Sequence, residues 1–359
     1  MLNRNLKLIT VTVIILLCFG SVLKAQDPDF SQFYNTPLYY NPANAGLYKG
    51  FKARFNYRRQ WVNIPGEFKS YNFSMDIADR DIPGAGGIGF LVNSNKEGIG
   101  WIKSTTVGII PAVRIPITSN FIMQVGSMIS VVHKEIDWDK LIFSDQLNAK
   151  YGNISPSSFT SPTSDKITYP DFSFGSIFQL KGDGVTGNLG LAAHHITRPI
   201  ESFVDASTPL DRKYVANLDI IFEIGQYKGY FKRKKGFKLN PGVFYQNQAN
   251  LNLYAIGMNL YLTSLYLGVW YRNESLEYDV YSNFLIMAGV YIPFTKSSRM
   301  KFMYSYDMQI TATNSFTGPS HEISIIFEFD DLKLINLKQS HNLFRGRTLP
   351  KEALECAPF

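Results

Sequence analysis

The sequence predicts an all-β protein, a transmembrane outer-membrane β-barrel of about 14 antiparallel strands. The first observation behind this fold class is an alternation of apolar and polar residues with a period of two, which recurs along most of the chain. The second is length, because several alternating segments have ten residues or more. Strands of soluble sheets usually have about 5 to 6 residues. Long strands with one apolar and one polar face are typical of membrane barrels.

The alternation begins in FKARFNYR at 51–58, where Phe, Ala, Phe and Tyr share one face and the basic and amide residues share the other. SYNFSMDI at 70–77 repeats the arrangement. Similar segments follow at 87–95, 101–117, 120–134, 170–180, 186–197, 213–224, 237–248, 251–262, 265–273, 279–293, 299–309 and 319–330. The resulting number of strands is even, as expected of an outer-membrane barrel.

One late segment separates a membrane barrel from a soluble sandwich or propeller. Large apolar residues follow one another on a single face at Met300, Phe302, Tyr304, Tyr306 and Met308. A soluble core rarely takes Tyr and Phe at successive positions, whereas a lipid-facing surface takes them easily, with Tyr and Trp near the strand ends. The opposite faces are predicted to line the lumen with both signs of charge, at Lys52, Arg54, Arg58, Asn72, Asp76, Lys301, Asp307, Glu322 and Glu328.

The connections alternate in length, as they do when every second connection lies on the same side of the membrane. If the mature N-terminus is periplasmic, the connections after odd-numbered strands face outward, and these include 135–169, 198–212, 273–278 and 310–318. The periplasmic ones include 118–119, 181–185, 263–264 and 294–298. Long loops outside and short turns inside are the outer-membrane pattern. Two connections do not fit, because 225–236 is long for a periplasmic turn and 249–250 is short for an external loop.

Four segments are expected along the chain. Residues 1–25 predict a secretory signal peptide, because Arg4 and Lys7 precede an apolar run from Leu8 to Phe19 and a cleavage site after Ala25. Residues 26–50 form a periplasmic leader or cap, 51–330 the barrel, and 331–359 a periplasmic tail. Cleavage removes three positive charges, so the net charge falls from +7 to +4, which is no sign of nucleic-acid binding. Only Cys356 then remains, which excludes an intramolecular disulfide.

Both ends of the chain resemble one family. The stretches are FSQFYNTPLYYNPANAG (Phe30 to Gly46), YRRQW (from Tyr57), SYNFSMD (from Ser70), YSYDMQI (from Tyr304), GPSHEISIIFEF (from Gly318) and CAPF (from Cys356). They resemble the PorP/SprF outer-membrane proteins of Bacteroidota, while the middle, about 90–290, adds little specificity. Asn44 and Ala357 depart from the family's pattern.

The resemblance implies a role in type IX secretion or gliding motility at the outer membrane of a Gram-negative bacterium. The implied partners are an exported type IX substrate or surface adhesin, other outer-membrane or periplasmic secretion and motility components, and the lipid bilayer. No nucleic acid is expected among them. None of these partners follows from the periodicity.

The leader contains the first candidate partner-binding residues, Tyr39, Tyr40, Asn41 and Pro42. Pro37 and Pro42 restrict the residues before them to extended conformations, so the aromatic rings are carried on a stiff segment. Such a leader is suited to docking a partner. The alternative is that it plugs or caps the periplasmic mouth of its own barrel, because it joins the first strand directly.

The connection 135–168 supplies a second group of candidate partner-binding residues, Asp137, Asp139 and Asp145. A loop longer than about 12 to 15 residues is commonly functional or disordered. It is therefore predicted to contact an exported protein or to form a mobile lid. The basic run from Tyr227 to Lys238 could bind an acidic partner or phosphate groups, although charge runs are usually solvated turns.

The polar residues of the family-like motifs are expected to be lumen or structural positions, namely Arg58, Trp61, Asp76, Asp307, His321 and Glu322. No catalytic, cofactor or metal site is expected, because no nucleophile, zinc or phosphate-loop spacing appears. His194 and His195 are adjacent on a predicted strand, so they are expected to point to opposite faces. His321 is expected to hydrogen-bond a lumen partner. Three functions are compared: a secretion or adhesin-anchoring barrel, a passive diffusion channel, and a barrel enzyme, which the missing site disfavours.

Overall fold

A computed structural model of the chain describes residues 27–330, apart from 65, 67, 79–84, 99–101, 149, 151, 154, 163, 204–208, 229–233, 263, 276–279, 296 and 311–316. The expected signal peptide and the expected tail at 331–359, with Cys356, lie outside the described residues. So does the centre of the basic run, at 229–233. Among the described residues, no helix is long and apolar enough to cross a bilayer.

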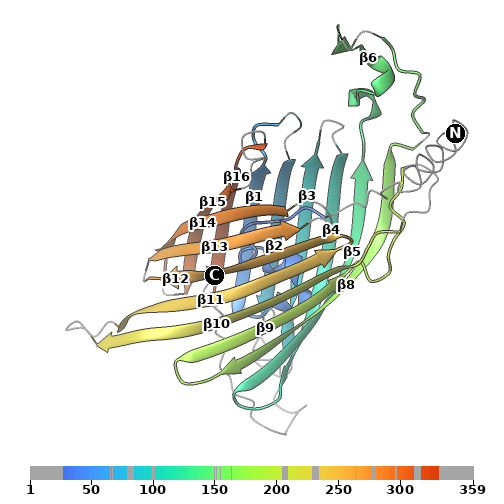
Figure 1. Cartoon of the computed structure of the whole chain (residues 1–359). Coiled ribbons are helices and arrows are strands. Elements are labelled where there is room, and N and C mark those ends of the chain that lie inside the picture. Colours follow the sequence, from blue (N-terminus) through green and yellow to red (C-terminus); the bar gives the residue numbers. More distant parts are fainter. Residues whose placement is uncertain are drawn as a thin grey trace, which may run out of the picture.

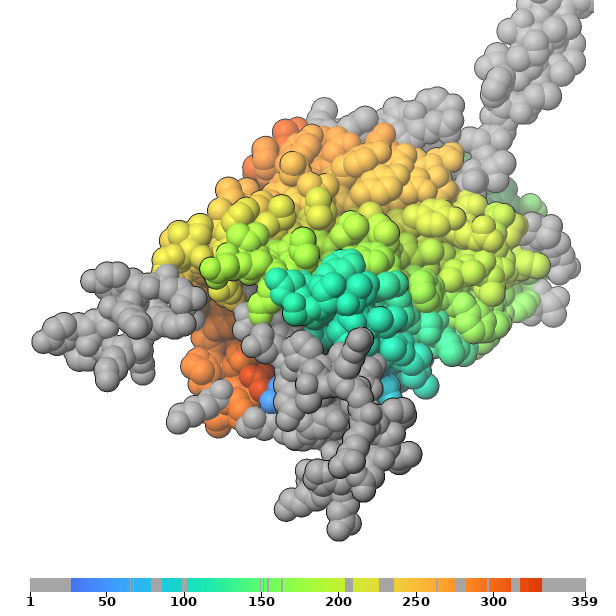
Figure 2. All heavy atoms as spheres, turned by 90° about the horizontal axis from the view of Figure 1, so that it is seen from below, coloured from blue at the N-terminus to red at the C-terminus, as the bar shows by residue number. Residues whose placement is uncertain are grey.

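Fourteen antiparallel strands form one closed barrel, which confirms the predicted fold class (Figure 1). Each strand pairs with its neighbours in sequence order, and β1 closes on β16 from Phe51↔Phe329 to Arg59↔His321. Figure 2 shows the same succession around the wall, from teal through green and yellow to orange. The strands are β1 (Gly50–Gln60), β2 (Phe68–Ala78), β3 (Ala85–Glu97), β4 (Ile102–Pro116), β5 (Phe121–Glu135), β8 (Lys166–Lys181), β9 (Val185–His194), β10 (Lys213–Lys228), β11 (Lys234–Gln248), β12 (Leu251–Tyr261), β13 (Leu265–Ser275), β14 (Val280–Pro293), β15 (Ser298–Gln309) and β16 (Ser320–Phe329).

The two faces of the strands differ as the alternation predicts. On β15, Phe302, Tyr304 and Met308 are exposed on the outside, while Lys301 and Asp307 are buried inside. Apolar side chains are exposed on the outer face of strands all around the barrel, among them Phe73, Ile109, Ile129, Phe174, Leu191, Leu218, Val243, Ile256, Val269 and Ile286. A closed sheet leaves no backbone edge unpaired in lipid. Its apolar exterior matches the hydrocarbon of a bilayer.

The connections at the two ends of the barrel differ in length. At one end, no more than six residues of sequence separate consecutive strands, namely β2 from β3, β4 from β5, β8 from β9, β10 from β11, β12 from β13 and β14 from β15. The other end carries the long connections 136–165 and 195–212, and we call it the long-loop end. The apparent exception at 225–236 disappears, because β10 and β11 continue past a bulge after Ile224 and leave only five residues of sequence between them. The tight connection at 249–250 remains, with Ala249 in a left-handed conformation.

Residues 27–49, which we call the leader, lie inside the barrel. Most of them are buried, from Phe30 through Leu47. The leader begins at the long-loop end, where Asp27 meets the ends of β9 and β10, and reaches the short-turn end at Gly50. It contains one helical turn, α2 (Pro37–Tyr40), and a 3-10 turn, η1 (Pro42–Asn44). The segment expected as a periplasmic leader or cap thus lies within the barrel, where it fills the lumen.

The long connection 136–165 folds on itself beyond the barrel end (Figure 1). It contains two 3-10 turns, η2 (Trp138–Lys140) and η3 (Ser144–Gln146), and a small hairpin of β6 (Leu147–Asn148) and β7 (Gly152–Asn153). Phe159 stacks on Phe143 at 4.3 Å between ring centroids and also meets Trp138 at 5.5 Å. Aromatic packing thus gives the connection an ordered shape of its own.

Candidate functional site: the leader inside the lumen

The leader is held at Ser31 by the charged residues of three motifs that are far apart in the sequence. Arg58 of β1 lies 3.2 Å from Asp307 of β15 and 3.8 Å from Glu322 of β16. The Ser31 hydroxyl contacts both Arg58 and Asp307, and its backbone N–H donates to Glu322 at 2.7 Å. These charges are all buried, so each one depends on its partners for the stabilisation that water would otherwise supply.

Gln32 connects the leader to the seam between the last strands. Its side-chain amide donates to the Ser305 hydroxyl at 3.2 Å and to the Glu322 carbonyl at 3.0 Å. Its amide oxygen accepts from Ser324 at 2.6 Å and from Asn35 at 2.7 Å. A buried polar side chain that uses both its donors and acceptors in this way fixes the position of the segment that carries it.

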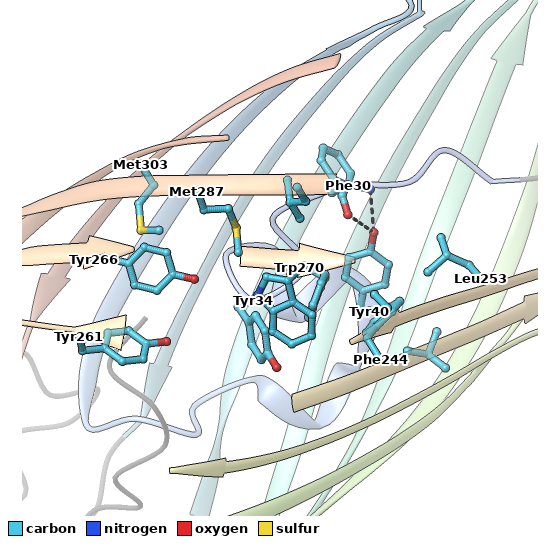
Figure 3. Packing of buried hydrophobic residues seen from close by; sticks show 14 of the residues in the cluster. Phe30, Tyr34, Tyr40, Phe244, Leu253, Tyr261, Tyr266, Trp270, Met287 and Met303 are labelled. Atoms are coloured by element: carbon cyan, nitrogen blue, oxygen red, sulfur yellow. Dashed lines mark hydrogen bonds between the residues drawn. The ribbon is translucent and has the colours of Figure 1, made fainter. Parts of the chain in front are cut away.

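Aromatic rings of the leader pack on rings from the wall in the middle of the lumen. Phe33 stacks on Phe244 of β11 at 4.5 Å and meets Trp270 of β13 edge-on at 4.9 Å. Figure 3 shows Tyr34 and Tyr40 grouped with Trp270 and Phe244, and the dashed lines join Tyr40 to Phe30. Trp270 is fully buried. The aromatic residues that were expected to dock a partner therefore pack against one another and against the wall.

Glycines in the wall allow the part of the leader from Pro42 to Gly46 to approach the strands closely. A side-chain carbon built on Gly126 of β5 would lie 2.5 Å from the Pro42 carbonyl oxygen, and one on Gly87 of β3 would lie 2.4 Å from the Gly46 Cα. Gly46 itself has φ +64°, a conformation that glycine adopts at no steric cost. Its N–H donates to Asp76 at 2.9 Å, and Arg54 holds the same carboxylate at 2.5 Å.

The first described residues of the leader are fixed at the long-loop end by ion pairs. Asp27 lies 2.8 Å from His195 and 3.6 Å from Lys213, and Asp29 lies 2.6 Å from Arg272. His195 follows the end of β9 and has φ 54°, so its ring turns inward with that of His194. The expectation that the two histidines point to opposite faces is wrong, because the strand ends between them.

The four candidate residues of the leader contact the lumen wall. The Asn41 side chain donates to the backbone of β8 and β9, at Ser176 and Leu191, and accepts from the Ala43 N–H at 2.9 Å as the cap of η1. Tyr40 and Pro42 are buried, and Tyr39 is partly buried against the same cluster. Contact with a partner through these residues would require the leader to leave its place.

The other motif residues divide between the two faces. Arg58, Asp76, Asp307 and Glu322 are buried in the lumen as expected. His321 is not a lumen residue: it pairs across the outer face, where its Nδ1 lies 2.8 Å from the Tyr304 hydroxyl. The reason is the alternation itself, since Glu322 next to it takes the inner face. Trp61 ends β1 in a left-handed conformation and packs edge-on against Phe68 at 4.8 Å.

The three acidic candidates lie in the connection 136–165. Asp145 accepts from the Ser158 N–H at 2.6 Å and from the Ser157 hydroxyl at 3.0 Å, so it joins the two halves of this connection. The hydrogen bond from the Ser158 backbone lowers the pKa of this exposed carboxyl. Asp137 pairs with Lys140 at 2.6 Å. Asp137 and Asp139 both line a cavity of about 800 Å³ between this connection and the barrel end.

Two polar clusters of the lumen were not singled out from the sequence as parts of a site. Glu328 of β16 receives Lys52 and Lys301, each at 2.8 Å, and also Arg299. Arg272 pairs with Asp29 and Glu274. The inward position of the lysines and of Glu328 was predictable from alternation, but their convergence depends on barrel closure. Among the described residues, no group of three or more His, Cys, Asp or Glu is placed to hold a metal ion.

The motifs that resembled one family at the two ends of the sequence meet around the leader. A family model described as the type IX secretion system membrane protein PorP/SprF matches residues 22–327. The chain belongs to the PorP/SprF family. It is thus an outer-membrane β-barrel of a type IX secretion family. No curated protein matches the sequence at a significant level.

Solved structures with a similar barrel come from other bacteria. A Pseudomonas aeruginosa FadL homologue is 11% identical to this PorP/SprF chain, with 87% of this chain and 95% of that one covered and a TM-score of 0.45. The toluene transporter TodX of P. putida is 11% identical, with coverage of 83% and 94% and a TM-score of 0.39. Omp33 of Acinetobacter baumannii is 10% identical, with coverage of 79% and 99% and a TM-score of 0.38. Similarity at this level says nothing about the function of this chain.

Proposed function

We propose that this barrel supports type IX secretion, or the surface anchoring of an exported adhesin-like protein, by protein–protein interaction. The observation that carries the proposal is the filled lumen. The leader occupies the barrel from one end to the other, and the cavities beside it, near Asn41 and near Asp27, are each only about 50 Å³. A barrel filled in this way is suited to present a fixed surface. Passive diffusion would need a continuous aqueous path.

The connection 136–165 is the proposed contact surface for the exported protein. This connection extends beyond the end of the barrel (Figure 1). It carries exposed apolar side chains at Ile142, Leu147 and Phe159. Exposed apolar groups rimmed by polar residues commonly mark an interaction site. Asp137 and Asp139 at the cavity below supply charge that selects among partners. Asp145 acts by holding the surface in shape.

Affinity purification from native outer membranes tests the contact surface. The tagged wild-type barrel and a variant with Ile142→Ser and Leu147→Ser are purified, and co-purifying exported proteins are quantified. We expect the variant to insert normally. The amount of exported protein that co-purifies with it should fall about tenfold or more, because the loss of well-packed apolar contacts weakens binding. The control is Phe294→Ser at the short-turn end, where an apolar ring is as exposed as Leu147. Equal recovery with both variants would refute this surface.

Conductance in planar bilayers tests the alternative of a diffusion channel. The wild-type barrel is expected to remain closed, whereas deletion of 30–47 is expected to give steady conductance. A wild-type barrel that conducts as well as the deletion variant would favour the diffusion channel. This measurement needs no knowledge of the partner.

A further inference from the structure

A small polar cavity lies at the long-loop end of the lumen, beside the first described residue of the leader. Its volume is about 50 Å³, whereas one water molecule needs about 10–15 Å³ measured in the same way. The ends of β3, β4, β5 and β8 form one wall, in which Asn95 is paired with Ser104 and Asn93 with Thr106. Asp27 and Tyr39 of the leader also line the cavity.

The lining offers more hydrogen-bond acceptors than donors. The Oδ1 atoms of Asn95 and Asp171 are buried and have no hydrogen-bond partner, and both residues are more than nine-tenths buried. The Glu97 side chain, at the end of β3, makes no hydrogen bond or ion pair with any described residue. Against these acceptors stands one unpaired donor, the side-chain amide of Asn93. Buried acceptors without partners are costly, so this lining favours a group with several donors.

The charges around the cavity point to the same kind of group. Lys134 pairs with Glu201, Lys213 with Asp27, and His195 with both Asp27 and Asp171. Burial opposes the charged form of His195, in the loop after β9, but the two aspartates outweigh it and raise its pKa to about 10. Three cations therefore face four carboxylates. Glu97 is the one of these four without a direct ion pair among the described residues.

We propose that this cavity holds a primary ammonium group. An ammonium has three donors and no acceptor, which matches the unpaired oxygens of Asn95, Asp171 and Glu97. Its positive charge balances the remaining carboxylate. A hydroxyl or a neutral amide would meet the acceptors only in part and would leave Glu97 uncompensated.

The chain itself can supply this ammonium. Cleavage after Ala25, as the sequence predicts, creates a new α-ammonium on Gln26, which is bonded directly to Asp27 in the lining of the cavity. The Asp27 side chain is 20% exposed, so the cavity lies close to the surface of the molecule at this point. The same chemistry is carried by a lysine side chain or a chain terminus of a partner, and the experiment separates the two sources.

The first part of the experiment follows the α-amine of the mature protein purified from outer membranes. Intact mass is expected to show Gln26 as the first residue with a free amine. The protein is then treated with 2-pyridinecarboxaldehyde, which reacts with α-amines and spares lysine side chains. We expect the folded wild type to react about tenfold more slowly than Glu97→Gln, because loss of a charge-assisted hydrogen bond releases the amine. Asn95→Leu provides a second variant should the first fail to insert.

The matched control is Glu135→Gln, which removes a partly exposed carboxylate paired with Lys103 at the same end of the barrel. Its α-amine is expected to stay as protected as in the wild type. Equal labelling of wild type and Glu97→Gln, or a first residue that is cyclised or lies elsewhere, would exclude the chain's own terminus as the source.

The second part decides the proposal in that case. Thermal unfolding of the wild type is recorded with n-butylammonium chloride and with n-butanol. If a partner supplies the ammonium, n-butylammonium raises the unfolding temperature of the wild type and not that of Glu97→Gln, while n-butanol raises neither. An α-amine that is unprotected, together with no effect of n-butylammonium, would overturn the proposal.

Discussion

The close approach of the leader to the wall predicts that one added methyl group will disturb it. In Gly126→Ala the new carbon would lie 2.5 Å from the Pro42 oxygen and 2.7 Å from the Pro42 carbonyl carbon. Real contacts of this kind essentially never fall below 3.0 Å. Because the neighbours are backbone atoms, no side chain can rotate away, and either the leader or the strand must shift. Overpacking of this type costs about 1–3 kcal/mol.

The matched control is Gly187→Ala on β9, where no atom lies within 4 Å of the new carbon. Neither glycine needs a left-handed conformation, so alanine is conformationally acceptable at both positions. Alanine in a strand is favoured over glycine by about 0.5–1 kcal/mol, so Gly187→Ala should be neutral or stabilising. The preference for alanine applies to both variants and cancels, so they are expected to differ by the overpacking cost of about 1–3 kcal/mol.

Urea unfolding of the purified barrel in detergent measures this difference through the shift of the midpoint at constant slope. Limited proteolysis of the leader adds a second measurement. If the leader leaves its place instead of straining the wall, Gly126→Ala will keep the barrel's midpoint and expose sites within 30–47 to the protease. Equal midpoints together with an equally protected leader in both variants would refute the packing described here.

Three further predictions concern the charges, the lipid face and the orientation. Arg58→Met should cost about 3–5 kcal/mol, since it leaves two buried carboxylates without their cation, whereas exposed Arg59→Met should cost little; urea midpoints compare them, and similar losses would contradict the buried cluster. Phe73→Arg should cost about 2–4 kcal/mol near the bilayer midplane, and unchanged unfolding relative to Phe73→Leu would argue against lipid at this face. A cysteine within 155–162 should react with an impermeant label on intact cells and one within 230–236 should not; the reverse result would invert the orientation.

The strands could be predicted from the sequence because one rule, alternation over two faces, is repeated in every strand and is imposed by lipid on one side. Phe302 is apolar and the adjacent Lys301 is charged, so residue type alone predicts that they lie on opposite faces of the strand. The place of the leader could not be predicted in the same way. Its Pro, Asn and aromatic residues indicate a stiff segment, but nothing in them says that the barrel is wide enough to contain it.

The site itself was partly predictable. Arg58, Asp76, Asp307 and Glu322 were expected in the lumen, and alternation alone places them there. What they bind was not predictable, because Ser31 reaches them only after strands from both ends of the chain close into a ring. His321 was assigned to the wrong face, since a family-like motif suggested a role for the pair His321–Glu322 while adjacent strand residues must separate.

The position of the leader has a consequence for how the barrel is made. Its Leu38 and Ala45 pack on Leu91, Ile110 and Met128, all from the first half of the chain, so this cluster needs none of the later strands. Its aromatic residues then offer a template for the later strands β11 to β15. A finished ring offers no lateral entry, so a leader that is not in place when β1 meets β16 can enter only through an end of the barrel. A large folded domain fused ahead of Asp27 would therefore be expected to stall closure, whereas a short peptide would be carried along inside the curling sheet.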